Sequence, residues 1–354
     1  MQLRDIGADL AQAVEQASGE RQPLVIVGGG TKGFYGRRVD GTELSVSGHR
    51  GITNYEPTEL VLSARGGTPL VEIESALAEH GQMLPFEPPR FGATATLGGA
   101  LACGLSGPAR PYRGAARDFV LGTRVLNGRG EALRFGGEVM KNVAGYDVSR
   151  LMVGALGTLG IVLEASLKVL PRPAAEITLV RDEDPDAALE TMNALGGKPY
   201  PLTASAFDGE RLYLRFSGAR AAVDAAAARV GGERLSDADD WWCSVRDHTH
   251  PFFIDDAPLW RLSLPATAPL ADREGIGFVE WGGAQRWLRG ERAAQAMWDQ
   301  ARKAGGHATL YRGGDRTAGV FQPLPAAMTA IHRRMKQAFD PHGIFNVHRL
   351  YAEW

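Results

Sequence analysis

The sequence predicts an α+β protein with at least two domains, and three observations lead to this fold class. Leu24–Val27 is an apolar, β-branched run typical of a buried strand, and it leads directly into the glycine-rich loop Gly28–Gly36. Small residues fill nearly every position from Gly92 to Gly107. The prolines of Pro171-Arg172-Pro173 interrupt regular structure and indicate a domain boundary. From Ile177 onward, strand and helix patterns alternate, which predicts helices on one face of a sheet.

The composition is that of a folded globular protein. Among the 354 residues, charged side chains make up 23% and the hydrophobic set 44%, which excludes a disordered chain. Acids and bases are mixed along the chain and leave a net charge of −2, so no nucleic-acid partner is expected. No apolar run approaches membrane-spanning length, and we expect a cytoplasmic protein without direct membrane insertion.

Cysteine is rare in this sequence. The two cysteines are Cys103 and Cys243, and an iron–sulfur cluster normally needs four thiolates, so this chain cannot hold one alone. A disulfide between them stays open, although cytoplasmic proteins rarely carry one. His248 and His250 form a close pair without an accompanying carboxylate pattern, so we expect core or surface histidines there and no metal site.

The N-terminal half is expected to combine helices with short strands. Residues 3–18 carry an apolar stripe at helical spacing. A second helix is expected to be capped by Thr68, with Pro69 at its first position and Gly81 at its end. Its buried face should be Leu70, Ile73 and Leu77, and the expected strands are 24–27, 43–47, 52–55, 60–64, a hairpin of 119–126 and 132–135, and a long strand within 154–169.

In the second half of the sequence, expected strands alternate with expected helices. The expected strands are 177–180, 204–207, 212–216, 259–264, 277–280 and 308–311. The expected helices are 187–195, 219–230, 238–246, 291–304 and, near the C-terminus, 324–339.

The first glycine-rich loop is where we expect the chain to hold a cofactor. Glycines let backbone N–H groups approach a diphosphate closely, and Thr31 and Lys32 add a hydroxyl and a positive charge. Gly28, Gly30 and Gly33 fit G-x-G-x-x-G, but no helical pattern follows, so a dinucleotide Rossmann loop is rejected. A Walker A loop is excluded because no Gly-Lys-Ser/Thr closes it. A tight turn in an ordinary α/β protein remains the structural alternative.

The second small-residue segment strengthens the cofactor hypothesis. Small side chains bury little area, so a core strand would not use them, whereas a backbone pressed against a flat or anionic ligand would. Thr94 and Thr96 offer hydroxyls there, and Gly98 and Gly99 allow close approach. The arginines that follow could also belong to a solvated basic loop.

Four segments together resemble the FAD-binding family of vanillyl-alcohol oxidase and p-cresol methylhydroxylase (PCMH) type. They are VGGGTKGFYG (27–36), ATATLGGALACGLSGPARPYRGAARDFVLGTRVL (93–126), FGGEVMKNVAGYDVSRLMVGALGTLGIVLEASLKVLPRP (135–173) and FDPHGIFN (339–346). The resemblance implies a two-lobed PCMH-type FAD-binding domain over 1–173, with the nucleotide between the lobes. It further implies a smaller ferredoxin-like α+β cap over 174–322, and a C-terminal helix and tail, 323–354, that pack back on the FAD domain.

The resemblance also implies which residues contact the cofactor. FAD would be held without a covalent link, because neither glycine-rich segment contains a histidine. The implied FAD-binding residues are Gly28, Gly29, Gly30, Thr31, Lys32, Gly33, Thr94, Thr96, Gly98, Gly99, Cys103, Gly107, Arg117, Asp118, Gly160, Ile161 and Val162.

The function implied is that of a FAD-bearing subunit in a multi-subunit glycolate (2-hydroxy-acid) dehydrogenase or oxidase. Its expected partners are a catalytic FAD subunit and an iron–sulfur subunit, which could attach it peripherally to the inner membrane. Two alternatives stay open: a self-sufficient FAD-dependent oxidoreductase on another small hydroxy acid, with Lys141, Tyr146 or Arg349 near the flavin, and a structural subunit with non-catalytic FAD.

No catalytic residue can be assigned from the sequence. Hydroxy-acid oxidation needs a base for the hydroxyl proton and cations for the carboxylate. Arg110 and Arg113 could supply cations, but the cap stretch 278–291 contains no histidine, and Glu280 is expected to face solvent from a strand. The first oxidation is therefore expected on a partner chain.

Overall fold

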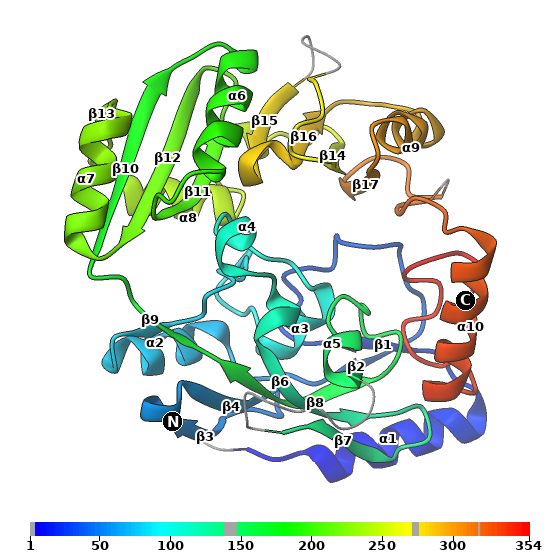
Figure 1. The fold of residues 1–354 in the computed structure, drawn as a ribbon. Helices are drawn as coiled ribbons and strands as arrows, with labels where there is room; N and C mark the ends of the chain where they lie inside the picture. The colour runs from blue at the N-terminus through cyan, green and yellow to red at the C-terminus, as the bar shows by residue number, and fades with distance from the viewer. Residues whose placement is uncertain (1–3, 138–146, 271–275, 318) are drawn as a thin grey trace. The chain divides into compact units, whose positions relative to one another are not determined.

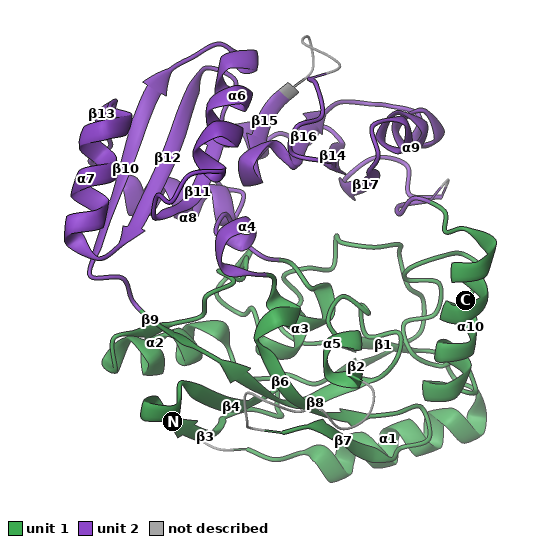
Figure 2. Ribbon diagram, viewed as in Figure 1, with its two compact units in different colours: residues 1–105, 115–171, 323–354 green, residues 106–114, 172–322 purple. Residues whose placement is uncertain are grey.

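The computed structural model describes residues 4–137, 147–270, 276–317 and 319–354. The chain divides into two compact units (Figure 2): unit 1 comprises 1–105, 115–171 and 323–354, and unit 2 comprises 106–114 and 172–322. Both units combine sheets with helices, so the predicted α+β class is confirmed. As domain boundaries, the expected divisions after 173 and 322 stay a prediction; the two units differ from them chiefly in grouping 106–114 with the later residues.

The larger lobe of unit 1 is an antiparallel five-stranded sheet in the order β3-β4-β8-β6-β7, with helices α2 and α3 on it (Figure 1). Leu70, Ile73 and Leu77 of α2 are fully buried, which confirms the predicted face. The elements of this lobe are β3 Ile52–Glu56, η1 Pro57–Glu59, β4 Val61–Arg65, α2 Leu70–Glu79, β5 Gln82–Met83, α3 Leu97–Cys103, η2 Ala116–Phe119, β6 Val120–Leu126, β7 Ala132–Gly136, α5 Val148–Leu151, β8 Ile161–Lys168 and β9 Leu170–Pro171.

The smaller lobe of unit 1 joins the two ends of the chain. Strands β1 (Leu24–Val27) and β2 (Thr42–Ser45) pair in parallel and pack with α1 (Gly7–Glu20). The C-terminal segment runs beside β1: Leu24 N donates to Ile344 O at 2.7 Å, and Asn346 N donates to Leu24 O at 3.0 Å. Phe345 is fully buried in this core, and helix α10 (Ala326–Phe339) precedes the segment.

In unit 1 one local expectation is wrong, and one helix was not predicted. Thr68 does not cap α2, because Pro69 is the N-cap residue itself; the Thr68 hydroxyl instead accepts from Gly51 N at 2.9 Å and donates to Gly51 O at 3.2 Å. The small-residue segment also contains a helix, α3, which glycine-rich composition concealed. Its N-cap is Thr96, whose hydroxyl accepts from Gly99 N at 3.3 Å.

Unit 2 is built on an eight-stranded sheet in the order β13-β10-β12-β11-β15-β16-β14-β17 (Figure 1). Its elements are α4 Arg110–Arg113, β10 Ala175–Asp182, α6 Pro185–Gly196, β11 Leu202–Phe207, β12 Arg211–Gly218, α7 Arg220–Val230, β13 Glu233–Arg234, α8 Ala238–Arg246, η3 Pro251–Phe253, β14 Leu259–Ser263, β15 Ile276–Glu280, η4 Trp281–Gly283, β16 Gln285–Arg289, α9 Ala294–Lys303 and β17 His307–Arg312.

The prediction that helices cover one face of this sheet is wrong for α8. Helices α6, α7 and α9 share one face, where the apolar side chains of alternate strand positions gather. Helix α8 lies on the opposite face: Trp242 Nε1 donates to Thr178 Oγ1 at 2.9 Å, and the Trp241 ring stacks on Tyr213 with centroids 3.9 Å apart. Strand β11 is buried on both faces, so both faces require cover.

Candidate functional site

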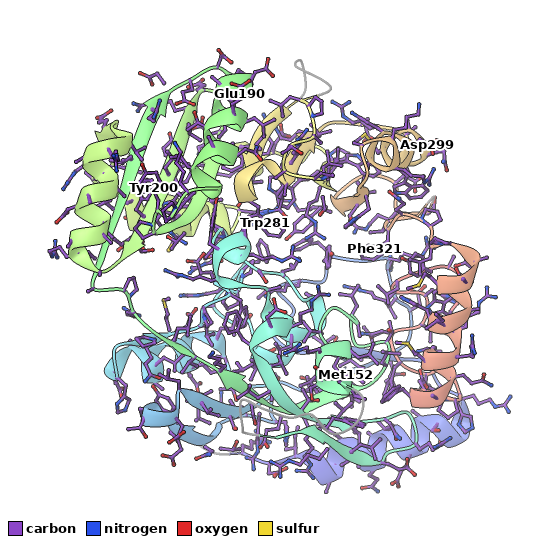
Figure 3. All side chains as sticks on the ribbon, viewed as in Figure 1. Met152, Glu190, Tyr200, Trp281, Asp299 and Phe321 are labelled. Atoms are coloured by element: carbon purple, nitrogen blue, oxygen red, sulfur yellow. The ribbon has the colours of Figure 1, made fainter. Side chains whose placement is uncertain are left out.

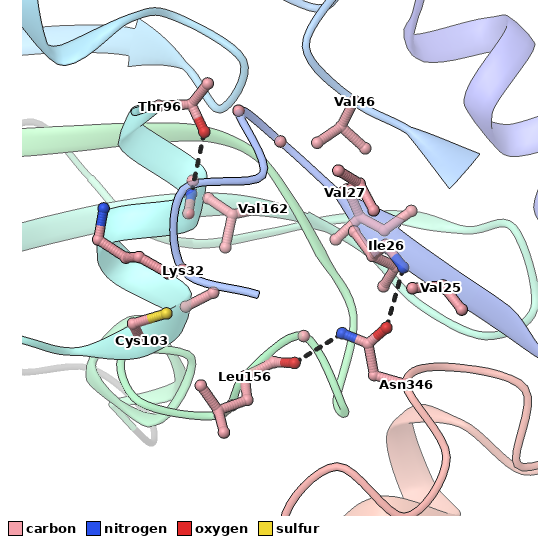
Figure 4. A pocket seen from close by; sticks show the side chains of 18 of the residues that line it. Val25, Ile26, Val27, Lys32, Val46, Thr96, Cys103, Leu156, Val162 and Asn346 are labelled. Atoms are coloured by element: carbon pink, nitrogen blue, oxygen red, sulfur yellow. Dashed lines mark hydrogen bonds between the residues drawn. The ribbon is translucent and has the colours of Figure 1, made fainter. Parts of the chain in front are cut away.

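A cleft lies between the two lobes of unit 1, and about 1020 Å³ of space inside it, part of which is open to solvent, is free of protein atoms. Its walls come from the end of β1, the glycine-rich loop, helix α3, the turn before β8, and the C-terminal segment (Figure 4). The lining residues are Val25 to Gly33, Val46, Thr96, Gly98, Gly99, Ala102, Cys103, Met152, Ala155, Leu156, Gly157, Gly160, Ile161, Val162, Asn346 and Arg349.

The two glycine-rich segments pack directly against each other at this cleft. Thr94 Oγ1 donates to Gly29 O at 2.8 Å, and a Cβ added to Gly29 would lie 1.6 Å from Thr94 O. A Cβ on Gly28 would lie 2.5 Å from Thr96 Oγ1. The close packing of the two segments therefore requires glycine at these positions, whether or not a ligand also contacts them.

The loop presents donors for an anion. Within the described residues, the backbone N–H groups of Gly29, Gly30 and Thr31 make no hydrogen bond to the protein. Gly30 has φ +72°, a left-handed conformation that glycine adopts without strain, and the space beside its Cα is open. Unsatisfied N–H groups directed into a cleft are the usual means of binding phosphate oxygens.

Two cationic side chains lie beside these backbone donors. Lys32 is 7% exposed, and its Nζ donates to Thr31 Oγ1 at 3.3 Å and to Arg90 O at 3.2 Å. Arg349 donates to Gly33 O at 3.1 Å, and burial lowers the pKa of its guanidinium. Together with the amides, these groups fit a dinucleotide diphosphate.

The opposite wall is apolar and is fastened by Asn346 (Figure 4). Asn346 Oδ1 accepts from Ile26 N at 2.9 Å, while its Nδ2 donates to Leu156 O at 2.7 Å. One side chain thus links strand β1, the turn before β8 and the C-terminal segment. A Cβ on Gly157 would lie 2.7 Å from Asn346 Nδ2, so this turn packs tightly on the amide.

Cys103 is the one cysteine among the described residues that line the cleft. Burial raises the pKa of its thiol to about 11, although Lys32 and Arg349 act in the opposite direction. A thiol of that pKa is protonated at neutral pH and is a weak nucleophile. Cys103 and Cys243 form no disulfide with each other.

The structure brings most of the sequence-predicted site residues together. Thirteen of them line the cleft: Gly28, Gly29, Gly30, Thr31, Lys32, Gly33, Thr96, Gly98, Gly99, Cys103, Gly160, Ile161 and Val162.

Four others lie outside the cleft lining. Thr94 contacts the glycine-rich loop through its hydroxyl, which donates to Gly29 O. Gly107 belongs to unit 2, where its carbonyl accepts from Trp281 Nε1 at 3.2 Å. Arg117 and Asp118 lie on η2, where Asp118 accepts from Ala115 N at 2.8 Å. As cofactor contacts, all four stay predictions.

Other residues raised by the sequence lie elsewhere. Arg110 and Arg113 are in unit 2, where Arg110 covers the Trp281 ring at 4.5 Å and Arg113 bonds Ser217 Oγ at 3.1 Å. His248 is a core histidine, as expected, stacked on Phe253 with centroids 4.0 Å apart. Lys141 and Tyr146 lie outside the described residues.

Comparison with known proteins agrees with this geometry. Residues 7–136 match the family model described as FAD binding domain. The glycolate oxidase subunit GlcE of Escherichia coli is 48% identical over 349 residues, which cover 99% of this chain and 98% of that protein. The glycolate oxidase subunit GlcD of Bacillus subtilis is 30% identical over 58% of this chain and 44% of its own length.

The fold itself has solved relatives. An alkyldihydroxyacetonephosphate synthase structure superposes with a TM-score of 0.67 and 18% identity, covering 97% of this chain and 76% of the other. At that identity the likeness concerns the fold alone.

Proposed function

The chain belongs to the family of glycolate oxidase subunits that includes GlcE of Escherichia coli, and from this premise we propose that it is the FAD-bearing subunit of a multi-subunit glycolate (2-hydroxy-acid) oxidase or dehydrogenase. The observation that carries the proposal is the cleft of unit 1, where unsatisfied backbone N–H groups and two cations face an apolar wall. Residues 7–136, which match an FAD binding domain, supply most of it.

Each part of the cleft has a role toward the cofactor. The N–H groups of Gly29, Gly30 and Thr31 would hold the diphosphate, with Lys32 and Arg349 balancing its charge. Asn346 would keep the apolar wall at a fixed separation from the loop. When bound, FAD would supply hydride and electron transfer, while the protein supplies binding, orientation and electrostatics. Since Cys103 is a weakly nucleophilic thiol, we propose that FAD is bound without a covalent link.

The partner subunits that we propose follow from the chemistry that this chain lacks. Two cysteines cannot hold an iron–sulfur cluster, so an iron–sulfur subunit would carry electrons onward, beside a second, catalytic FAD subunit. Among the described residues no helix has the length and apolar character needed to cross a bilayer. Attachment to a membrane would then be peripheral and would occur through partner subunits.

The function is tested on the purified chain. We expect a visible flavin spectrum with bands near those of oxidised FAD, and precipitation with acid should release the flavin into the supernatant. Flavin that stays in the pellet would contradict the non-covalent proposal. A colourless protein that takes up no added FAD would contradict the proposal that this subunit bears FAD.

One sequence argument against substrate chemistry on this chain no longer holds. The expectation that Glu280 faces solvent is wrong: the residue is 3% exposed. Assignment of the first oxidation to a partner chain stays a prediction. Its test is anaerobic mixing of the FAD-loaded chain with excess glycolate, D-lactate or D-2-hydroxyglutarate, and rapid bleaching of the flavin would overturn it.

A further inference from the structure

The 347–354 segment brings a cation from the far end of the sequence to the glycine-rich loop. Arg349 lines the cleft, and its Nη2 donates to Gly33 O at 3.1 Å. In the opposite direction, Arg37 N donates to Arg349 O at 2.9 Å. A Cβ on Gly36 would lie 2.9 Å from Arg349 Nε, so glycine at this position lets the two segments meet. The side chain and the backbone of Arg349 therefore both bond the loop.

The positive charge of Arg349 is available to a ligand in the cleft. Its hydrogen-bond acceptors are the backbone carbonyls of Lys32 and Gly33, and among the residues that the structure describes no carboxylate pairs with it. Burial lowers the pKa of the guanidinium, as desolvation of a cation does. A guanidinium in this setting attracts an anion that offers several oxygens, and a diphosphate is such an anion.

The backbone on either side of Arg349 is held in unusual conformations. Asn346 has φ +39° and His348 has φ +64°, and side chains rarely adopt this left-handed region. Such conformations persist where the surrounding contacts impose them. Asn346 is held by both ends of its side-chain amide. His348 N donates to Trp354 O at 3.0 Å, so the direction in which the chain enters Arg349 depends on the position of Trp354.

The Trp354 ring is anchored on helix α10, beside which the segment ends (Figure 1). The Arg333 guanidinium lies 5.5 Å from the centre of the Trp354 ring, and the His332 ring meets it edge to face at 6.5 Å. Tyr351 adds a contact within the segment, with ring centroids 5.0 Å apart. Tryptophan forms the strongest cation–π pairs of the aromatic side chains. These contacts connect α10 to the residue that places Arg349.

We propose that Trp354 and Arg333 are positioning residues for the cofactor. By holding the 347–354 segment on α10, they keep the Arg349 guanidinium at the diphosphate and so slow the release of FAD. The identity of the ligand as FAD rests on the proposed function, whereas a diphosphate group rests on Arg349 and on the backbone N–H donors of the loop. These residues take no part in the oxidation.

The proposal predicts a change in the rate of FAD release. While the segment is detached from α10, the bound cofactor lacks its contact with Arg349. Contacts made after docking act chiefly on the dissociation rate constant, and the association rate constant changes little. Trp354→Ala should therefore release FAD several-fold faster, with an association rate constant within about twofold of that of the natural chain.

The test follows flavin fluorescence after rapid mixing and after dilution of the FAD-loaded chain. Arg333→Gln should release FAD faster, as Trp354→Ala does, and Trp354→Phe should restore most of the natural rate because it keeps an aromatic face for Arg333. Arg334→Gln is the matched control: it removes the same charge from the next position of α10, where the Arg334 Nε bonds Ala330 O within the helix at 3.3 Å. An equal effect of Arg334→Gln would overturn the proposal.

A double variant separates positioning from a general loosening of unit 1. Arg349→Gln is expected to release FAD about tenfold faster, as for the loss of one hydrogen bond to a charged group. Because Trp354 acts through Arg349, adding Trp354→Ala to that variant should change the rate little further. Additive effects of the two substitutions would contradict the proposal. If Trp354→Ala does not fold, Arg333→Gln takes its place in the double variant.

Two further measurements do not depend on flavin. By hydrogen exchange, the Arg37 N–H, which bonds Arg349 O, should lose protection in Trp354→Ala, while the Leu24 N–H stays protected by Ile344 O. Unchanged exchange at Arg37 would contradict the proposal. Inorganic pyrophosphate is the second probe. A chain that takes up no FAD, yet binds pyrophosphate in a manner weakened by Arg349→Gln, would refute the proposed function and support this inference, and a chain that binds neither would refute both.

Discussion

Lys336 and Asp340 form an ion pair of 2.5 Å inside unit 1, with 8% and 0% of their side chains exposed. Lys336 Nζ also donates to Thr158 O and Phe345 O, each at 2.8 Å. Asp340 in turn accepts from the backbone N–H groups of Ile344 and Phe345 at 3.0 and 2.8 Å. The pair therefore joins the end of α10, the turn before β8 and the C-terminal segment that lines the cleft.

Asp340→Asn is expected to destabilise unit 1 by about 3–5 kcal/mol, the usual cost of leaving a buried charge without its partner. Burial lowers the pKa of Lys336, and Asp340 opposes that effect, so the variant should also lower this pKa further. Denaturant unfolding measures the change. Asp299→Asn on α9 (Figure 3) is the control, because the Arg302–Asp299 pair at 2.6 Å is exposed and little change is expected there. Equal losses in the two variants would contradict a structural role for the buried pair.

Asn346→Asp is expected to weaken FAD binding while the fold persists. An aspartate can still accept from Ile26 N, but it loses the donor to Leu156 O, and an unsatisfied buried carbonyl costs about 1–3 kcal/mol. Fluorescence titration of the flavin-free protein with FAD should show a dissociation constant raised about tenfold or more. An unchanged constant would mean that Asn346 does not fix the cleft wall.

Gly29→Ala is expected to lose most bound flavin. Its Cβ would lie 1.6 Å from Thr94 O, a backbone atom, so the two glycine-rich segments must move apart. The ratio of flavin to protein absorbance measures the loss. Gly19→Ala is the control, since a Cβ there meets nothing within 4 Å and Gly19 lies inside helix α1. Full flavin occupancy in Gly29→Ala would show that the segments need not stay in contact.

Cys103→Ser is expected to leave flavin occupancy and its release by acid unchanged. The pKa of about 11 keeps the thiol protonated, so it should neither form a flavin adduct nor act as an anion in the cleft. Mass spectrometry of the denatured natural chain should give the mass of the polypeptide alone. A mass increased by one flavin, lost in Cys103→Ser, would refute this prediction.

Acidification should weaken unit 2 through His248. Burial and two arginines, Arg312 and Arg261, hold the pKa of His248 well below 6.5 in the folded protein. The unfolded chain therefore binds a proton near pH 6.5 while the folded chain does not, and stability falls as pH drops below that value. Unfolding followed by tryptophan fluorescence at pH 7.5 and pH 5 measures the loss.

His248→Phe should reduce this pH dependence, because the ring stacked on Phe253 would no longer titrate. Absolute stability can also change in the variant, so the difference between the two pH values is the readout. His250 and His307 also have lowered pKa values, and a smaller pH dependence should remain. An unchanged pH dependence in His248→Phe would contradict the prediction.

Sequence patterns predicted the parts of the cleft that are continuous in the chain. The strand 24–27 and the glycine-rich loop after it are where the sequence places them, because an apolar run followed by glycines has few other structures. Helix α3 was not predicted, since Gly98 and Gly99 have poor helix propensity; a Cβ on Gly98 would lie 2.9 Å from Gly66 O, so close packing overrides propensity here. Strand β16 was missed because the glycine turn before it masks its pattern.

Long-range contacts were beyond sequence reasoning. Asn346 and Leu156 are 190 residues apart, and no local pattern links them. Glu280 was expected in solvent because a strand exposes alternate residues, yet the indole of Trp287 and the amide of Gln285 bond it inside the sheet. Both results depend on which strands become neighbours.

The pairing of β1 with the C-terminal segment determines when the cofactor site can exist during synthesis. Leu24 bonds Ile344 and Asn346, and Arg349 bonds the glycine-rich loop, so the cleft lacks one wall until residue 349 has left the ribosome. A nascent chain could fold the five-stranded sheet, whose last strand ends at Lys168, and later the whole of unit 2. Flavin capture would nevertheless follow translation of the C-terminal segment, and a chain cut short after Gln322 would be made, yet unable to retain its cofactor.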